Sequence, residues 1–200
     1  MDAIADIIVR GGWVMLPLLV LSVISLALSF ERALFWITTH NAPRRARINP
    51  FTRALREGDA DKARSVMKTD RSVYGKFSRA LLNERDRPEA FAAATAASVE
   101  SLRTAIERWS VTLSTIITAA PMLGILGTVT GIIRSFGALG ETTTPDPARV
   151  ASGISEALVT TALGLAIALI TLFPYMIFRG QAERCLSRFE VMIASAETRK

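Results

Sequence analysis

One apolar stretch of this chain places small or hydroxylated residues at intervals of three and four positions, a stripe formed by Pro121, Gly124, Thr128, Gly131 and Ser135, with Gly127 beside it. Residues at these intervals share one face of an α-helix. In a membrane span, small residues mark the close approach of another backbone, and polar residues turn away from lipid. We expect this face to contact another helix or to line a polar path.

A second stretch repeats the pattern with Gly153, Ala157, Thr161, Gly164, Ala168 and Thr171. Close packing of two helices would by itself explain the glycines and alanines. A threonine hydroxyl donates and accepts hydrogen bonds but does not ionise near neutral pH. Thr128 and Thr161 could therefore pass a proton along a pore but could not store one. Thr160 stands next to Thr161, so either hydroxyl could face such a path.

Two charged residues flank the stripes. An acidic group near a membrane span is a functional candidate, which applies to Glu156, although a carboxylate that stabilises a helix start explains it too. Arg134 lies near the end of the first stripe, and a helical hairpin would bring it to a similar depth. We predict a contact or a shared polar network between the two residues. A titrating carboxylate must come from Glu156 or from another chain.

The elements that position these residues are three runs without a charged residue, at 11–30, 110–133 and 157–178. Each run is long enough to cross a bilayer, which takes about 20 apolar residues in a helix. The runs are too long and continuous for barrel strands. The first lacks the cleavage site of a secretion signal. We predict an all-α integral membrane protein with three transmembrane helices.

The basic residues predict the orientation, because they stay on the cytoplasmic side of membrane spans. Segment 39–109 holds 15 Lys or Arg against 9 acidic residues. By contrast, Arg10 is the single basic residue of the first ten residues, and Arg149 is the single basic residue of segment 137–156. The predicted order is a periplasmic N-terminus (1–10), transmembrane helix 1 (11–38), a cytoplasmic helical segment (39–109), transmembrane helix 2 (110–137), a short periplasmic loop (138–153), transmembrane helix 3 (154–178) and a cytoplasmic helical tail (179–200).

Within the cytoplasmic segment, Asn49-Pro50 and later turn signals predict short helices over 51–56, 61–68 and 73–83. From Pro88 to Ala120 there is neither glycine nor internal proline, so we expect one helix to run unbroken into the second span. Apolar faces at helical spacing continue in both extensions, as Val99, Leu102 and Ile106, and as Leu186, Phe189 and Ile193. They predict a cytoplasmic helical bundle that continues the membrane spans and forms between subunits.

Several classes of function find no support in the sequence. The net charge of +6 suits anionic membrane lipid, and no nucleic-acid-binding motif accompanies it. Cys185 and His40 each stand alone, which predicts neither a disulfide nor a metal site. No nucleophile with its base and no phosphate-binding loop is present, so we expect neither an enzyme nor a cofactor.

Two motifs carry a family resemblance. Ala120-Pro-Met-Leu-Gly-Ile-Leu-Gly-Thr-Val-Thr-Gly131 and Ile154-Ser-Glu-Ala-Leu-Val-Thr-Thr-Ala-Leu-Gly164 resemble the MotA/TolQ/ExbB proton channel family, in its ExbB/TolQ branch. The resemblance implies a homopentamer in the bacterial inner membrane around the single spans of an ExbD- or TolR-like dimer, whose membrane aspartate titrates. Proton flow would then energise a TonB- or TolA-like protein. Thr128 and Thr161 would be pore hydroxyls, and Glu156 a carboxylate at the edge of the span.

Two other functions remain open at this point. A structural membrane scaffold would need the stripes for packing alone. A flagellar stator of the MotA type is disfavoured because that branch has four spans. The sequence does not separate TonB-linked uptake from envelope maintenance by a Tol system.

Overall fold

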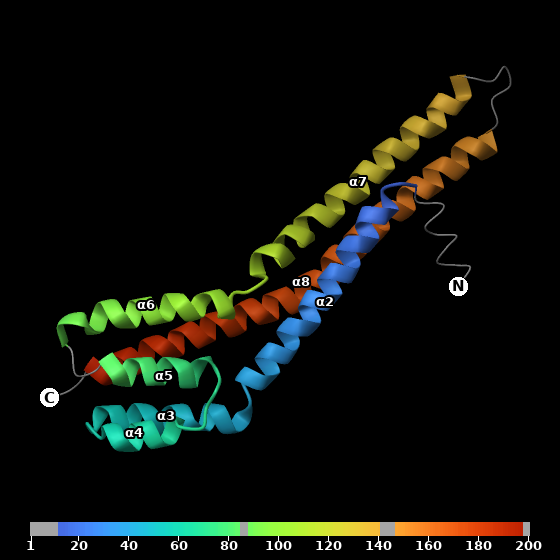
Figure 1. The fold of residues 1–200 in the computed structure, drawn as a ribbon. Helices are drawn as coiled ribbons and strands as arrows, with labels where there is room; N and C mark the ends of the chain where they lie inside the picture. Colours follow the sequence, from blue (N-terminus) through green and yellow to red (C-terminus); the bar gives the residue numbers. More distant parts are fainter. Residues whose placement is uncertain (1–11, 85–87, 141–146, 198–200) are drawn as a thin grey trace. The chain divides into compact units, whose positions relative to one another are not determined.

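The structure is a computed structural model that describes residues 12–84, 88–140 and 147–197. These residues form seven helices: α2 (Met15–Thr39), α3 (Ala42–Arg56), α4 (Ala60–Met67), α5 (Val73–Glu84), α6 (Pro88–Ile106), α7 (Ser110–Gly140) and α8 (Pro147–Glu197) (Figure 1). Segments Met15–Thr39, Ser110–Gly137 and Val150–Glu197 are long and apolar enough to cross a membrane. The prediction of an all-α protein with three candidate spans is confirmed.

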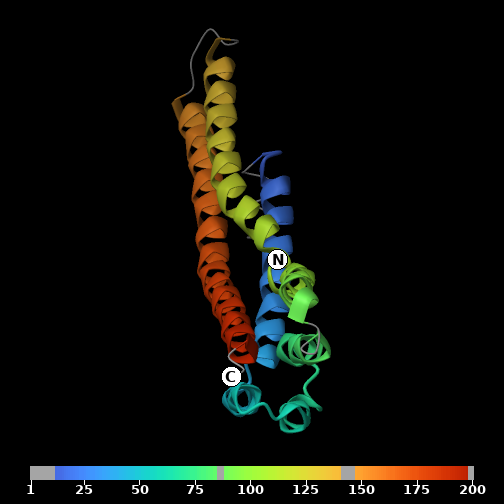
Figure 2. The same ribbon diagram turned by 90° about the vertical axis from the view of Figure 1, so that its left-hand side faces the viewer.

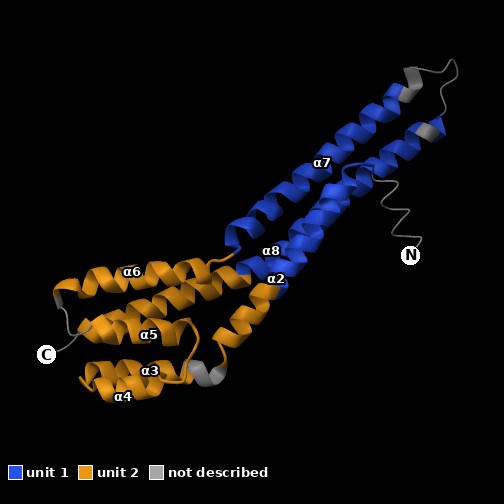
Figure 3. Ribbon diagram, viewed as in Figure 1, with its two compact units in different colours: residues 1–30, 109–176 blue, residues 31–108, 177–200 orange. Residues whose placement is uncertain are grey.

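The chain divides into two compact units (Figure 3). Unit 1 comprises residues 1–30 and 109–176, and unit 2 comprises residues 31–108 and 177–200. The stripes predicted to carry function lie in unit 1, whereas the predicted cytoplasmic extensions lie in unit 2.

In unit 1, α7 and the first part of α8 run side by side and antiparallel (Figures 1 and 2). Their pairing shows the direction, because Gly131 faces Ala157 while Gly164 faces Ala120. The turn expected between them falls largely in residues 141–146, outside the described residues. The start of α2 completes the unit through an apolar cluster of Val14, Leu18, Ile116, Ala120 and Ile167.

In unit 2, α3 packs on α4, α4 on α5, and α5 on α6. Asp59 caps α4 by accepting a hydrogen bond from the Lys62 backbone N–H at 2.9 Å. The buried core gathers Phe51, Tyr74 and Phe77 around Phe189 of α8. The apolar faces of α6 and of the α8 end pack into this same core. They therefore meet within one chain rather than needing a second subunit.

The predicted start of α3 at Asn49-Pro50 is wrong. The helix begins at Ala42, with a proline in its first turn, and Pro50 lies inside it. A proline in the first turn costs no hydrogen bond, whereas an internal one removes a bond. The helix continues because Ile48 and Phe51, on either side of Pro50, are both buried in the core.

The prediction of one unbroken helix from Pro88 into the second span is also wrong. Helix α6 ends at Ile106, α7 begins at Ser110, and Trp109 has a φ of 66°. The cause lies in α2, where the 3 % exposed Arg32 donates from Nη1 to the carbonyls of Ala105 at 3.0 Å and Ile106 at 3.5 Å. These carbonyls of the last turn of α6 accept hydrogen bonds from a cationic side chain, in place of the backbone N–H groups that a further helical turn would supply.

Candidate functional site

The two stripes are the surfaces on which α7 and α8 contact each other. A Cβ atom added to Gly124 would lie 3.0 Å from the Thr161 Cα, and one on Gly164 would lie 2.5 Å from the Ala120 carbonyl oxygen. On Gly131 it would lie 2.7 Å from the Ala157 Cβ. Only glycine permits this approach, because a side chain would meet backbone atoms or, at Gly131, the Ala157 Cβ, none of which can rotate away.

This close approach gathers three threonine hydroxyls at the Gly124 carbonyl. Thr161 Oγ1 donates to the Gly124 oxygen at 2.9 Å, and Thr160 Oγ1 lies 3.3 Å from it. The hydroxyl oxygens of Thr128 and Thr161 are 3.3 Å apart, and Thr128 Oγ1 donates to the Ile125 carbonyl at 2.7 Å. The hairpin thus holds polar atoms in an otherwise apolar stretch.

Burial distinguishes the two neighbouring threonines. Thr160 is 1 % exposed and fills the space left by Gly127, on which a Cβ would overlap the Thr160 side chain. Thr161 and Thr128 are only half-buried. Of the three hydroxyls, Thr128 and Thr161 are the pair placed toward the surface, and Thr160 belongs to the packing.

The charged groups of Arg134 and Glu156 converge on the backbone of Gly12. A Cβ on Gly12 would lie 3.1 Å from Arg134 Nη2 and 3.6 Å from Glu156 Oε1. Gly12 has a φ of 63°, which other residues rarely adopt. The two side chains therefore approach the same point before α2, and an ion pair between them stays a prediction.

A buried hydroxyl pair joins α2 to α8. Ser25 and Thr171 are 2 % and 0 % exposed, and their hydroxyls form a short hydrogen bond. Ala157, Gly164 and Ala168 of the second stripe are buried too, whereas Gly153 and Thr161 are half-buried. Thr171 thus turns toward α2, so the second stripe contacts two different helices.

The outward side chains of α7 and α8 in unit 1 are apolar and exposed, as at Ile125, Val129, Ile133, Leu165 and Leu169. Exposed apolar surface of this extent fits lipid or further subunits. Pro121 lies inside α7, where it frees a backbone carbonyl, and Ser135 is buried with its hydroxyl donating to the Gly131 carbonyl at 2.9 Å.

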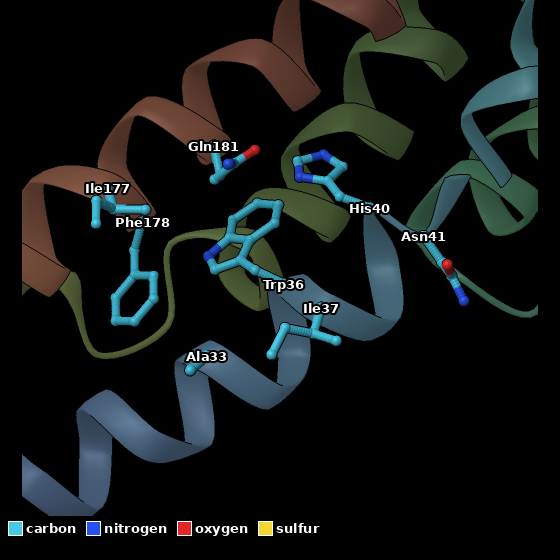
Figure 4. Close-up of a pocket in the computed structure, with 8 residues that line it drawn as sticks. All are labelled: Ala33, Trp36, Ile37, His40, Asn41, Ile177, Phe178 and Gln181. Atoms are coloured by element: carbon cyan, nitrogen blue, oxygen red, sulfur yellow. The ribbon is translucent and has the colours of Figure 1, made fainter. Parts of the chain in front are cut away.

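Unit 2 contains an apolar cavity of about 450 Å³ beside the end of α2 (Figure 4). Trp36, His40 and Asn41 line it from the side of α2, and Phe178 and Gln181 line it from α8. His40 Nε2 lies 2.8 Å from the Tyr74 hydroxyl, to which Arg188 Nη1 donates at 3.0 Å. His40 thus belongs to a structural network that its isolation in the sequence did not indicate.

Among the residues that the structure describes, no group of three His, Cys, Asp or Glu side chains could hold a metal ion. The arrangement that remains is the half-buried hydroxyl pair on the hairpin. It can accept hydrogen bonds, but without a titrating group it can perform no acid–base cycle by itself.

Comparison with known proteins agrees with this arrangement. The profile of the MotA/TolQ/ExbB proton channel family matches residues 64–191, which include both stripes. The putative biopolymer transport protein ExbB-like 1 of Synechocystis sp. is 37% identical over 179 residues, 87% of this chain and 68% of that protein. ExbB-like 3 of the same organism is 36% identical over 173 residues, 85% of this chain and 82% of that protein.

The Tol-Pal system protein TolQ of Pseudomonas aeruginosa is 38% identical over a shorter stretch of 77 residues, which covers 38% of this chain and 33% of that protein. The chain belongs to the MotA/TolQ/ExbB proton channel family, and it is a multi-pass membrane protein of the ExbB/TolQ kind. The resemblance seen in the two motifs is confirmed. The family consists of transport and channel subunits and is not a class of enzymes.

Proposed function

We propose that this chain is the channel subunit of a proton-driven motor in the bacterial inner membrane. The observation that carries the proposal is the pair of half-buried hydroxyls, Thr128 and Thr161, held 3.3 Å apart on a close-packed apolar hairpin. Polar side chains within a membrane span are candidates for function, and a proton path is one such function. Family membership supports the same function.

The proton carrier comes from a second protein. Threonine does not titrate, and the Glu156 carboxylate extends toward Gly12 rather than toward the Thr128–Thr161 pair. The proposed partner is an ExbD- or TolR-like protein with one membrane span and an aspartate in that span. Protonation of this aspartate beside the hydroxyls, followed by release on the other side, would couple the proton gradient to movement of the partner.

The proposed assembly is a homopentamer around a dimer of partner spans, with the N-terminus in the periplasm and the C-terminus in the cytoplasm. The exposed apolar surfaces of unit 1 would then contact neighbouring subunits and lipid. Movement of the partner would energise a TonB-like protein for outer-membrane uptake or a TolA-like protein for envelope maintenance. Arg134 and Glu156 would together keep the periplasmic mouth of the path close to neutral.

Proton flux measured in liposomes tests this proposal. The chain is reconstituted alone and with an ExbD- or TolR-like single-span protein, and internal pH is followed with a dye under a pH gradient. We expect flux only when the partner is present, and none when the partner's membrane aspartate is replaced by asparagine.

Assembly without flux in the presence of the partner would contradict the proposal and support a structural scaffold, the function that would need the stripes for packing alone. A gene deletion separates the systems. Impaired uptake indicates a TonB-like output, envelope leakage indicates a TolA-like output, and lost motility would indicate a flagellar stator.

A further inference from the structure

A second cavity in unit 2, of about 280 Å³, lies where α2 ends and α5 begins. Its walls include Phe35, Thr38 and Thr39 from α2, Arg71 and Ser72 from just before α5, and Lys76 from its first turn. The larger cavity of Figure 4 borders the same end of α2, but no Lys or Arg is among its described lining residues. The two cavities therefore differ in charge.

The smaller cavity is cationic. Arg71 and Lys76 are both exposed, and within the described ranges neither has an ion-pair partner. No acidic residue is among the described residues that line this cavity. The neighbouring Asp70 is 1 % exposed, and its Oδ1 accepts a hydrogen bond from the Ser72 backbone N–H at 2.8 Å. One oxygen of this carboxylate is thus bound to the backbone beside the cavity.

Hydroxyl groups add to this site. Ser72 Oγ accepts a hydrogen bond from the Tyr74 N–H at 3.2 Å, which leaves the hydroxyl hydrogen of Ser72 for an oxygen ligand. Two cations with a hydroxyl donor match a phosphate group, whose oxygens accept several charge-assisted hydrogen bonds. The chemistry therefore favours a phosphate ester over a carboxylate or a neutral ligand.

The apolar side of the cavity indicates the source of that phosphate. α2 is one of the three candidate membrane spans, and the cavity opens at its last turn. Phe35 lines the cavity, and Leu34, one turn before Thr38 on the same face of α2, is 50% exposed. A soluble phosphate would gain nothing from these side chains, whereas the acyl chains of a lipid would cover them.

We infer that this cavity binds the phosphate headgroup of an anionic phospholipid at the membrane surface, with Arg71 and Lys76 as its cationic ligands. The inference requires α2 to cross a membrane, but it does not require proton conduction. Its failure and the failure of the proposed function are therefore distinguishable.

Native mass spectrometry of the purified full-length chain tests the inference. The protein in detergent is titrated with phosphatidylglycerol, with phosphatidylcholine and with inorganic phosphate. We expect wild type to retain phosphatidylglycerol in preference to the other two. Because a cation near a lipid surface contributes about fivefold in affinity, the Arg71→Ala/Lys76→Ala double variant should lose roughly 25-fold, and Lys76→Gln about fivefold.

A matched control is Arg53→Ala/Lys68→Ala, which removes the same charge from two exposed positions outside the cavity and should retain the lipid. Equal lipid retention by the Arg71→Ala/Lys76→Ala variant and wild type would overturn the inference. So would an equal loss in the control pair, which would indicate net charge rather than a site. Tight binding of inorganic phosphate that displaces phosphatidylglycerol would overturn the lipid as the ligand. Circular dichroism verifies that each variant keeps the helical content of wild type.

Discussion

The hydroxyl oxygens of Thr128 and Thr161 lie 3.3 Å apart across the α7–α8 interface, and both residues are only half-buried. Their helices approach so closely because Gly124 and Gly164 have no side chain at the contact. The hydroxyl pair and the glycine contacts are therefore one structural unit with two separable properties, polarity and close packing. Substitutions can change either property while leaving the other.

Replacing Thr161 by valine removes the hydroxyl and keeps the shape of the side chain. The loss of one hydrogen bond to the Gly124 carbonyl should cost about 1 kcal/mol of unfolding free energy. We expect the complex to assemble and its proton flux to disappear, and the same for Thr128→Val. The measurement is dye-reported flux in liposomes that contain the partner.

Thr130→Val is the matched control for these variants. Thr130 lies on α7 with Thr128, and its hydroxyl donates to the Leu126 carbonyl one turn earlier at 2.9 Å. It should retain wild-type flux. Full flux in both Thr161→Val and Thr128→Val would show that the hydroxyl pair is not part of the proton path.

Gly164→Ala tests the close packing. The added methyl group would lie 2.5 Å from the Ala120 carbonyl oxygen, so α7 and α8 must move apart. We expect a loss of about 1–3 kcal/mol in unfolding free energy. Thermal unfolding in detergent, followed by circular dichroism, measures it.

Gly180→Ala, on the same helix, has no atom within 4 Å of the added methyl group. Because alanine favours helix over glycine, this control should raise stability by up to about 1 kcal/mol. Equal melting temperatures for the two variants would contradict the packing described for Gly164.

Arg32→Met tests what ends α6. The variant leaves the Ala105 and Ile106 carbonyls without their cationic donor, which should cost about 2 kcal/mol. We expect chymotrypsin to cleave after Trp109 faster than in wild type. Arg64→Met, which loses only an exposed pair with Asp61 at 3.9 Å, should leave the cleavage rate unchanged. An unchanged rate in Arg32→Met would mean that another contact ends the helix.

Tyr74→Phe should change how stability depends on pH. Burial raises the pKa of the Tyr74 phenol far above its ordinary value of 10. Above pH 10 the unfolded chain releases a proton that the folded chain keeps, so unfolding free energy falls with pH by about 1.4 kcal/mol per pH unit. The stabilising contribution is complete below pH 10.

Urea unfolding at several pH values checks this prediction. Tyr74→Phe should be about 1–2 kcal/mol less stable at pH 8, because it loses the bonds to His40 and Arg188. Its stability should then fall less steeply above pH 10. Parallel curves for the two proteins would mean that Tyr74 ionises equally in both states.

Much of this fold follows from local pattern. The uncharged runs predicted α2, α7 and the membrane part of α8, because length and hydropathy suffice for a span. The break after Ile106 could not be predicted, because its cause, Arg32, lies 73 residues before Ala105. The helix start expected at Pro50 was wrong because a tertiary contact likewise decides it. The burial of Phe51 in the core outweighs the backbone hydrogen bond that the proline removes.

The candidate site, like the fold, could be predicted from the sequence only in part. Spacing alone identified the stripes, but it could not choose between Thr160 and Thr161, which differ by one helical position. The answer depends on Gly127 of the other helix, against which Thr160 packs. The charged groups of Arg134 and Glu156 likewise converge on Gly12, a residue outside both stripes. The roles of these residues in proton movement stay predictions.

The directions in which the Thr128 and Thr161 hydroxyls donate determine whether a carboxyl group binds beside them in its protonated or its ionised form. Thr161 donates its hydroxyl hydrogen to the Gly124 carbonyl, and Thr128 donates its own to the Ile125 carbonyl. Only the lone pairs of the two hydroxyl oxygens remain to bind a further group. A protonated carboxyl group can donate to them, whereas a carboxylate meets only electron-rich oxygen. A carboxylic acid brought to this hairpin would therefore bind its proton more tightly than it does in water, and would release it on leaving.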